Sequence, residues 1–155
     1  MQEVIDKLIK LKKTISTMES CTGGGVANAI TNIEGASEIL KFSAVTYSNE
    51  YKIKMGVSSK TIDKYSVYSI EVAKEMAYNI SKYANSDYGV GITGKLNRVD
   101  VNNPYGKDNI TFVSIYDKES DSYSCFNIET KENSREENKK LVISKIKNEL
   151  LKIIR

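Results

Sequence analysis

A short run of hydroxyl, thiol and glycine residues near the N-terminus is the first place where the sequence could do chemistry. Residues 19–25 read ESCTGGG, between a stretch predicted to be a strand and one predicted to be a helix. Glycine lets the backbone approach a ligand closely, and the first amides of a helix have no partner within it. Such a turn can bind a phosphate or a developing oxyanion. A plain helix cap followed by a flexible turn explains the same residues equally well.

The second candidate is the segment 47–52, with the sequence YSNEYK. Tyr47 is predicted to end a strand, and Lys52 follows about one helical turn later, so both could point into a cleft above the sheet edge. Lysine can act as a base when burial or neighbouring cations lower its pKa. An ordinary solvent-exposed lysine is the alternative, and this segment alone does not decide between the two.

The chain of 155 residues contains no histidine. This excludes Ser-His-Asp and Cys-His catalysis and the usual histidine-rich metal sites. A hydroxyl or thiol nucleophile would therefore need another base, such as Lys52. The two cysteines, Cys21 and Cys125, do not make a disulfide framework and fit a reducing compartment. Without a histidine to ionise its thiol, Cys21 is a weaker candidate nucleophile than Ser20.

Residues 89–94 read GVGITG and match the G-x-G-x-x-G string of dinucleotide-binding folds. That fingerprint needs an apolar strand before its first glycine and a helix that opens within the motif. Here the polar residues Asn85, Ser86 and Asp87 come first, and a polar segment follows. We therefore interpret these glycines as positions where a strand passes close to a ligand or to another backbone.

The spacing of apolar residues predicts alternating helices and strands, followed by a hairpin. Helices are expected over 4–11, over 26–33 with Glu34-Gly35 as its end, after caps at Ser48 and Ser69, and after a capping box at Ser134. Strands are expected over 14–18, 42–47, 88–93, 110–116 and 123–128, with a long loop over 95–108. This order predicts one α/β domain over residues 1–155, a three-layer α/β/α arrangement with a mixed sheet and a late β-hairpin.

The charge of the chain is nearly balanced, with 23 basic and 20 acidic residues and a net charge of +3. This balance argues against nucleic acid as a partner. The apolar runs are short and interrupted by lysine and aspartate, so we expect no signal peptide, no membrane association and a cytoplasmic location.

The two candidate segments together resemble the C-terminal domain of the competence/damage-inducible protein CinA. That family also includes stand-alone nicotinamide-nucleotide amidases. The resemblance extends over nearly the whole chain, and its further matches are the strings GAS at 35–37, SIEVA at 69–73 with Met76-Ala77, GITG at 91–94 and SREE at 134–137.

The resemblance implies hydrolysis of the carboxamide of nicotinamide mononucleotide, a small pyridine nucleotide, to nicotinate mononucleotide and ammonia. It implies a serine nucleophile, a lysine base and an assisting tyrosine hydroxyl, which fall on Ser20, Lys52 and Tyr47. It also implies a homo-oligomer and no metal or other cofactor. Substrate contacts are then expected from residues of the turn and of the neighbouring segments: Glu19, Cys21, Thr22, Gly23, Gly24, Asn49, Thr93, Gly94 and Arg135.

The sequence departs from the family pattern at two places. After Gly94 the family continues through a glycine- and proline-rich loop, whereas residues 95–100 here read KLNRVD. The usual Gly-Asp-Arg before the last helix is replaced by residues 133–135, which read NSR. The substrate is therefore open, and the alternatives are an inactive nucleotide-binding module or an amidase for another small carboxamide. Lys95, Arg98 and Arg135 are the cations that could hold a phosphate.

Overall fold

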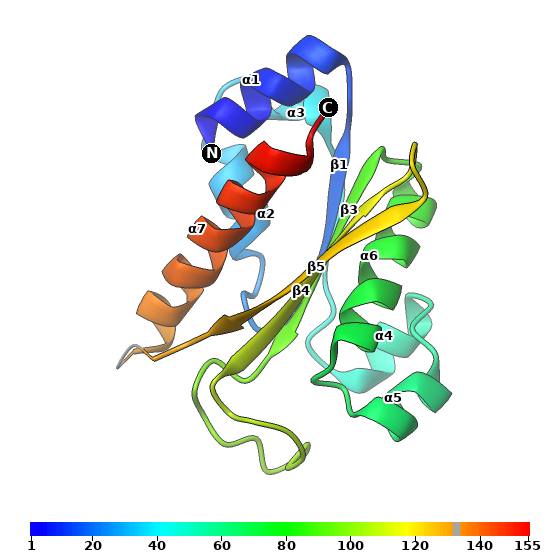
Figure 1. Ribbon diagram of the computed structural model, residues 1–155, viewed down its shortest axis with the longest axis vertical. Helices are drawn as coiled ribbons and strands as arrows, with labels where there is room; N and C mark the ends of the chain where they lie inside the picture. The colour runs from blue at the N-terminus through cyan, green and yellow to red at the C-terminus, as the bar shows by residue number, and fades with distance from the viewer. Residues whose placement is uncertain (132–133) are drawn as a thin grey trace.

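The computed structural model describes residues 1–131 and 134–155, and it contains a five-stranded mixed sheet (Figure 1). The strand order is β2-β1-β3-β4-β5, in which β1 lies parallel to β2 and β3, and β3, β4 and β5 are antiparallel. The last two strands form the expected hairpin. The strand bounds are β1 Ile15–Glu19, β2 Leu40–Val45, β3 Tyr88–Gly94, β4 Ile110–Asp117 and β5 Ser122–Glu129.

Helices cover both faces of this sheet (Figure 1). One face carries α1 Gln2–Leu11, α2 Gly25–Thr31, α3 Ala36–Ile39 and α7 Arg135–Ile153. The other carries α4 Asn49–Lys54, α5 Ser59–Tyr65 and α6 Ile70–Ala84. Each face has its own apolar core, a larger one that includes Val4, Ile30 and Val142 and a smaller one that includes Met18 and Met76. The predicted three-layer α/β/α arrangement is thereby confirmed.

Three of the predicted helix starts have the expected caps. The Ser48 hydroxyl accepts a hydrogen bond from the amide of Tyr51, and the Ser69 hydroxyl accepts one from the amide of Val72. At the last helix Ser134 forms a capping box with Glu137. These caps satisfy amides that the helices leave unpaired, which is why the serines mark the starts.

The glycines of the GVGITG string lie in β3, where the strand crosses α6. A Cβ on Gly89 would come within 2.0 Å of the carbonyl oxygen of Ala77, and one on Gly91 within 2.2 Å of that of Ala73. Such distances are impossible for a real side chain, so only glycine fits. The interpretation of close backbone approach is confirmed, and the match to a dinucleotide fingerprint is accidental.

Some boundaries differ from the sequence-based expectation. The helix that follows the glycine run ends at Thr31, and Gly35 begins the separate helix α3 in the left-handed conformation, with φ 87°. The strand expected over 42–47 ends at Val45, so Tyr47 lies beyond it. The helix α5 was not expected, because none of its side chains is buried and it has no apolar stripe.

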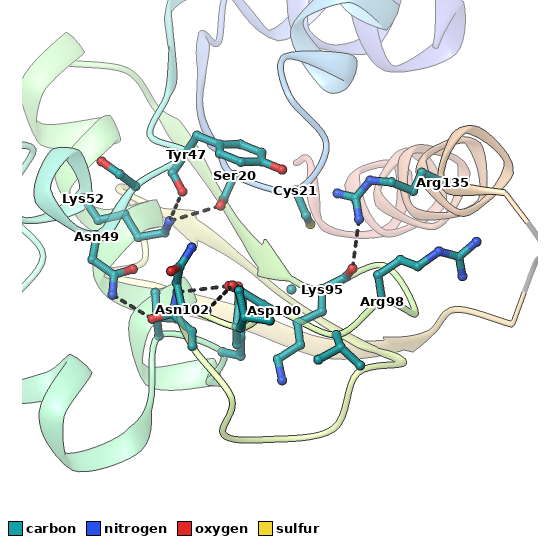
Figure 2. Close-up of a pocket in the computed structure, with 17 residues that line it drawn as sticks. Ser20, Cys21, Tyr47, Asn49, Lys52, Lys95, Arg98, Asp100, Asn102 and Arg135 are labelled. Carbon is teal, nitrogen blue, oxygen red and sulfur yellow. Dashed lines mark hydrogen bonds between the residues drawn. The ribbon is translucent and has the colours of Figure 1, made fainter.

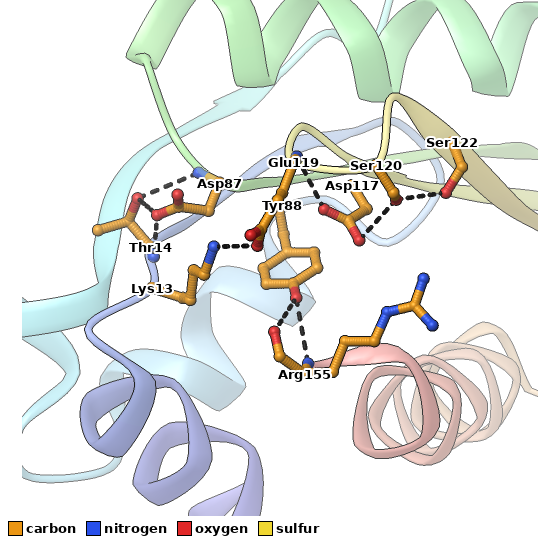
Figure 3. Close-up of polar contacts among 9 residues, drawn as sticks. All are labelled: Lys13, Thr14, Asp87, Tyr88, Asp117, Glu119, Ser120, Ser122 and Arg155. Atoms are coloured by element: carbon orange, nitrogen blue, oxygen red, sulfur yellow. Dashed lines mark hydrogen bonds and ion pairs between the residues drawn. The ribbon is translucent and has the colours of Figure 1, made fainter.

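The amino ends of the parallel strands are held by polar contacts far from the candidate segments (Figure 3). Asp87 accepts hydrogen bonds from the amide and hydroxyl of Thr14, at 2.7 and 2.8 Å, and the Tyr88 hydroxyl contacts the backbone of Arg155. Ser20 follows the opposite, carboxyl end of β1. Within the described residues, no helix is long and apolar enough to cross a membrane.

The connections of β1 create a crevice at its carboxyl end. From β1 the chain passes through α2 and α3 to β2 on one side, and from β2 it returns through α4, α5 and α6, over the other face, to β3 on the other side of β1. In open α/β sheets, ligands bind outside the carboxyl ends of strands where the connections diverge in this way. The topology therefore points to the segment that begins at Ser20.

Candidate active site

Ser20 is the first residue after β1. Its amide donates to the carbonyl of Ile92 on β3 at 3.1 Å, and its side chain lies at the floor of a cleft, 5% exposed. The chain then turns sharply into α2 through Gly23 and Gly24, which have φ of 62° and 88°. A side chain disfavours this left-handed backbone, so the glycines allow Ser20 to sit at a tight strand-to-helix turn.

Lys52 reaches Ser20 from α4 and lies beside it at one end of the cleft (Figure 2). Its Nζ lies 3.0 Å from the Ser20 Oγ, 2.8 Å from the carbonyl oxygen of Thr46 and 3.4 Å from that of Tyr47. The lysine is 1% exposed, although it belongs to a surface helix. The structure thus brings together the two side chains that the sequence proposed as nucleophile and base.

The surroundings of Lys52 favour its neutral form. Burial lowers the pKa of this amine to about 8, against smaller effects in the other direction from Cys21 and Asp100. In the neutral amine, two N–H groups can donate to the carbonyls of Thr46 and Tyr47, which leaves the lone pair for the hydroxyl hydrogen of Ser20. The arrangement is therefore that of a base and an activated hydroxyl.

Cys21 lines the same cleft but is poorly suited to attack. Burial raises the pKa of its thiol to about 11, so the thiolate is scarce near neutral pH. This agrees with the ranking of Ser20 above Cys21 from the sequence.

Glu19 was expected to contact the substrate, but its side chain is buried away from the cleft. It is fully buried, and its carboxylate accepts hydrogen bonds from the Thr22 hydroxyl at 2.6 Å and from the amides of Val26 and Ala27 at 3.0 and 2.9 Å. It also accepts one from the Thr17 hydroxyl at 3.1 Å. Glu19 therefore caps α2 from within and fixes the turn.

The sequence analysis suggested that the first amides of this helix could bind an oxyanion. Two of them, those of Val26 and Ala27, instead donate to Glu19. The Gly23 amide is also occupied, because it donates to the Ser20 carbonyl at 3.0 Å. The amides of Cys21, Thr22 and Gly24 are the candidate donors that remain in this turn.

Seven of the expected site residues line a cleft of about 580 Å³: Ser20, Cys21, Tyr47, Asn49, Lys52, Gly94 and Arg135. The other expected contacts do not line it. Besides Glu19, these are Thr22, whose hydroxyl bonds Glu19, Thr93, whose hydroxyl donates to the Val67 carbonyl at 2.9 Å, and the turn residues Gly23 and Gly24. Gly94 is at the end of β3, and Arg135 is the first residue of α7.

Tyr47 lies beside Ser20, but its hydroxyl is not directed at the pair. The ring is 67% exposed, and the contact of this residue with Lys52 goes through its backbone carbonyl (Figure 2). A role for the hydroxyl in proton transfer therefore requires the side chain to turn inward.

The wall opposite Ser20 comes from the loop after β3. Asp100 accepts hydrogen bonds from the Tyr68 hydroxyl, from the Asn103 side chain at 3.0 Å and from the Asn102 amide at 2.9 Å. Asn103 in turn accepts one from Asn49 of α4 at 2.9 Å. The sequence analysis predicted Asn49 but missed the other four residues of this network. Their roles depend on contacts between segments that are distant in the sequence.

The three cations named as phosphate candidates differ in their positions. Lys95 is buried and its amine bonds Asp108 at 2.8 Å, so it holds the loop together. Arg98 and Arg135 lie at the end of the cleft away from Lys52, and Arg135 donates to the Lys95 carbonyl at 3.3 Å (Figure 2). Of the NSR string that precedes α7, residue 133 lies outside the described residues.

The fold and site define a class of α/β protein with a serine and a buried lysine at the carboxyl edge of a mixed five-stranded sheet. The sequence profile described as the CinA C-terminal domain matches residues 1–153. The chain therefore belongs to the CinA C-terminal domain family.

Relatives and solved structures agree with this assignment. A putative competence-damage inducible protein of Clostridium kluyveri is 41% identical over 120 residues, 76% of this chain and 29% of that protein. One from Thermoanaerobacter sp. (strain X514) is 47% identical over 96 residues, 61% of this chain and 23% of that protein. This chain thus matches less than a third of the length of these relatives.

Two solved structures share the fold. The competence or damage-inducible protein from Enterobacter asburiae superposes with a TM-score of 0.87 at 22% identity, covering 99% of this chain and 95% of that one. The competence/damage inducible protein CihA from Agrobacterium tumefaciens gives a TM-score of 0.84 at 24% identity, covering 99% and 90%.

Proposed function

We propose that this protein is an amidohydrolase that converts nicotinamide mononucleotide to nicotinate mononucleotide and ammonia. The observation that carries the proposal is the distance of 3.0 Å between the Ser20 Oγ and the Nζ of a buried Lys52. A hydroxyl beside an amine with a pKa of about 8 is a nucleophile with its own base. The family resemblance supplies the substrate.

The reaction follows from the groups at the site. Neutral Lys52 takes the Ser20 proton as Oγ attacks the carboxamide carbon, and the oxyanion is held by amides of the turn that follows Ser20. The C–N bond then breaks, Lys52 returns the proton to the leaving nitrogen, and ammonia departs. Water attacks the resulting ester, with Lys52 again as the base, and restores Ser20. Arg98 and Arg135, which line the far end of the cleft, are the cations that we assign to the 5′-phosphate.

The test is ammonia release from nicotinamide mononucleotide by the purified protein, with nicotinate mononucleotide followed by chromatography. Wild-type protein is expected to release both products in equal amounts, and Ser20→Ala is expected to release neither above background. Ser37→Ala, a change on the exposed surface of α3, serves as the matched control and should retain full activity. Equal rates for wild type and Ser20→Ala would remove the proposal.

The wall formed by residues 95–103 favours one alternative, a module that binds the nucleotide without turning it over. Charged and branched side chains stand there in place of the glycine- and proline-rich loop of the family. A thermal shift with nicotinamide mononucleotide but no ammonia release would support that alternative. Turnover of a different small carboxamide, found by screening, would instead indicate an amidase with another substrate.

A further inference from the structure

Asp100 carries the only carboxylate among the described residues that line the cleft. The other charged side chains of the lining are cationic: Lys52, Lys95, Arg98 and Arg135. Asp100 lies on the wall opposite Ser20 and Lys52, whereas Arg98 and Arg135 lie at the far end, beyond Cys21 (Figure 2). A ligand that extends from Ser20 toward the arginines therefore passes Asp100 first.

The hydrogen bonds of Asp100 leave its charge intact while they fix its position. Partial burial alone would raise the pKa of this carboxyl, but the donors Tyr68, Asn103 and Asn102 outweigh that effect and hold the pKa below its ordinary value. Three of its acceptor positions are thereby used, by partners on the same wall. Asp100 is thus a fixed negative charge rather than a free hydrogen-bond acceptor.

A fixed charge of this kind suits one type of ring. The nitrogen of an N-substituted pyridinium is positively charged but carries no hydrogen, so it cannot be recognised through a hydrogen bond. It can be recognised by a negative charge such as that of Asp100. The Tyr68 ring also lines the cleft beside Asp100, with the Lys95 amine over it at 5.3 Å from the ring centre. A neutral ring of the same shape would gain nothing from the carboxylate.

We propose that Asp100 is a specificity-determining residue that selects carboxamides on a positively charged ring, so that the cleft prefers N-substituted pyridinium carboxamides to neutral rings of the same shape. This inference rests on the function proposed above and deepens it, because it assigns the recognition of the substrate ring to the segment in which this chain departs from its family. Asp100 takes no part in breaking the amide bond.

Such a selection also helps the base. The charge of Asp100 raises the pKa of Lys52, against the larger lowering by burial. A pyridinium beside Asp100 repels the ammonium form of Lys52 and so favours the neutral amine that accepts the Ser20 proton. A cationic substrate therefore promotes the protonation state that its own hydrolysis needs.

Nicotinamide mononucleotide and its reduced dihydropyridine form make a suitable pair of probes, because they share carboxamide, ribose and phosphate and only the oxidised ring is cationic. Binding is measured by titration calorimetry on Ser20→Ala protein, which excludes turnover. We expect the oxidised form to bind at least about fivefold more tightly, equivalent to about 1 kcal/mol. The double variant Ser20→Ala/Asp100→Asn, which keeps the shape and removes the charge, should reduce the preference to within about twofold.

The double variant Ser20→Ala/Tyr68→Phe is the matched control, because it removes one hydrogen bond from Asp100 but leaves the charge, and it should keep the preference. An unchanged preference after Asp100→Asn would overturn the proposal. So would loss of the preference in both variants, which would assign it to the position of the loop, or absence of a preference or of binding in the Ser20→Ala protein. Ammonia release by wild-type protein tests the amidohydrolase activity separately. A ring preference without ammonia release would contradict that activity but would still support the role of Asp100 in binding.

Discussion

At the scale of single residues, the property that matters most is the burial of Lys52, which lowers the pKa of its amine from 10.5 to about 8. Lys52 is the only base that the structure places against the Ser20 hydroxyl within the described residues, and its partners are two backbone carbonyls. Because carbonyls accept but do not neutralise charge, burial remains the main influence on its pKa. In the proposed reaction Lys52 therefore takes the place of a histidine.

The pH dependence of activity follows from this. The pKa of Lys52 is lowered from 10.5 to about 8, and only the neutral amine can take a proton. We expect kcat/KM for nicotinamide mononucleotide to rise with pH through an apparent pKa near 8 and to level off above it. Rate measurements between pH 6 and about 10 test this. A rate that falls over this range would contradict the role of Lys52 as base.

Glu19 should affect stability more than substrate affinity. Its carboxylate holds two amides of α2 and the hydroxyls of Thr17 and Thr22 inside the protein. Glu19→Gln replaces one acceptor oxygen by a donor, and we expect the free energy of unfolding to fall by about 2 kcal/mol. Denaturant unfolding measures this. Glu38→Gln on the exposed surface of α3 should change it by less than about 0.5 kcal/mol, and equal effects would contradict the capping role.

Sequence reasoning proposed Ser20 and Lys52, which the structure brings into contact, but it did not propose this cap. The absence of histidine and the glycine run made Ser20 and Lys52 candidates, and the family resemblance joined them as nucleophile and base. The role of Glu19 depends on the chain returning over its side chain seven and eight residues later, as α2 begins. Glutamate next to a serine in a turn has no local pattern that separates a buried cap from a substrate contact.

At the scale of elements, the contact between β3 and α6 positions the floor of the cleft. Gly89 and Gly91 bring the strand against the helix backbone, and β3 continues to Gly94 at the cleft. The spacing of apolar residues predicted both elements. The GVGITG string was correctly interpreted as part of a strand, because no helix opens within it.

Gly91→Ala should therefore be costly. Its Cβ would meet the Ala73 carbonyl oxygen at 2.2 Å, and backbone on both sides cannot easily move. We expect a loss of at least about 3 kcal/mol in the free energy of unfolding, measured by denaturant titration.

Gly25→Ala is the matched control for this prediction. Its Cβ would meet only the end of the Ile143 side chain, at 2.8 Å, which can change rotamer. We expect a change of less than about 1 kcal/mol. Similar costs at the two positions would contradict the account of the contact between β3 and α6.

The loop after β3 was predicted as a loop, but its shape was not. Leu96 and Asn97 are left-handed, with φ of 54° and 60°, a conformation that leucine rarely adopts. Leu96 is fully buried in the larger core, and its carbonyl accepts from the Asn138 side chain at 3.2 Å. Tertiary packing thus stabilises a backbone that the local sequence disfavours, and no pattern of residue types predicts it.

At the scale of the whole molecule, the cleft exists because of the order of the strands. Ser20 follows β1, Lys52 follows β2 by way of α4, and Asp100 follows β3, so three connections meet at one edge of the sheet. The alternation of elements predicted the α/β class and the hairpin. It did not predict that β1 lies between β2 and β3, because strand order depends on pairing between segments distant in sequence.

The central claim is that Ser20 and Lys52 act as one unit. The most direct test compares rates of ammonia release from nicotinamide mononucleotide for wild type, Ser20→Ala, Lys52→Met and the double variant. We expect each single change to reduce kcat by at least about 10³-fold and the double variant to be no slower than either single one, since either loss disables the same step. Ready turnover by Lys52→Met, or losses that multiply in the double variant, would contradict the account.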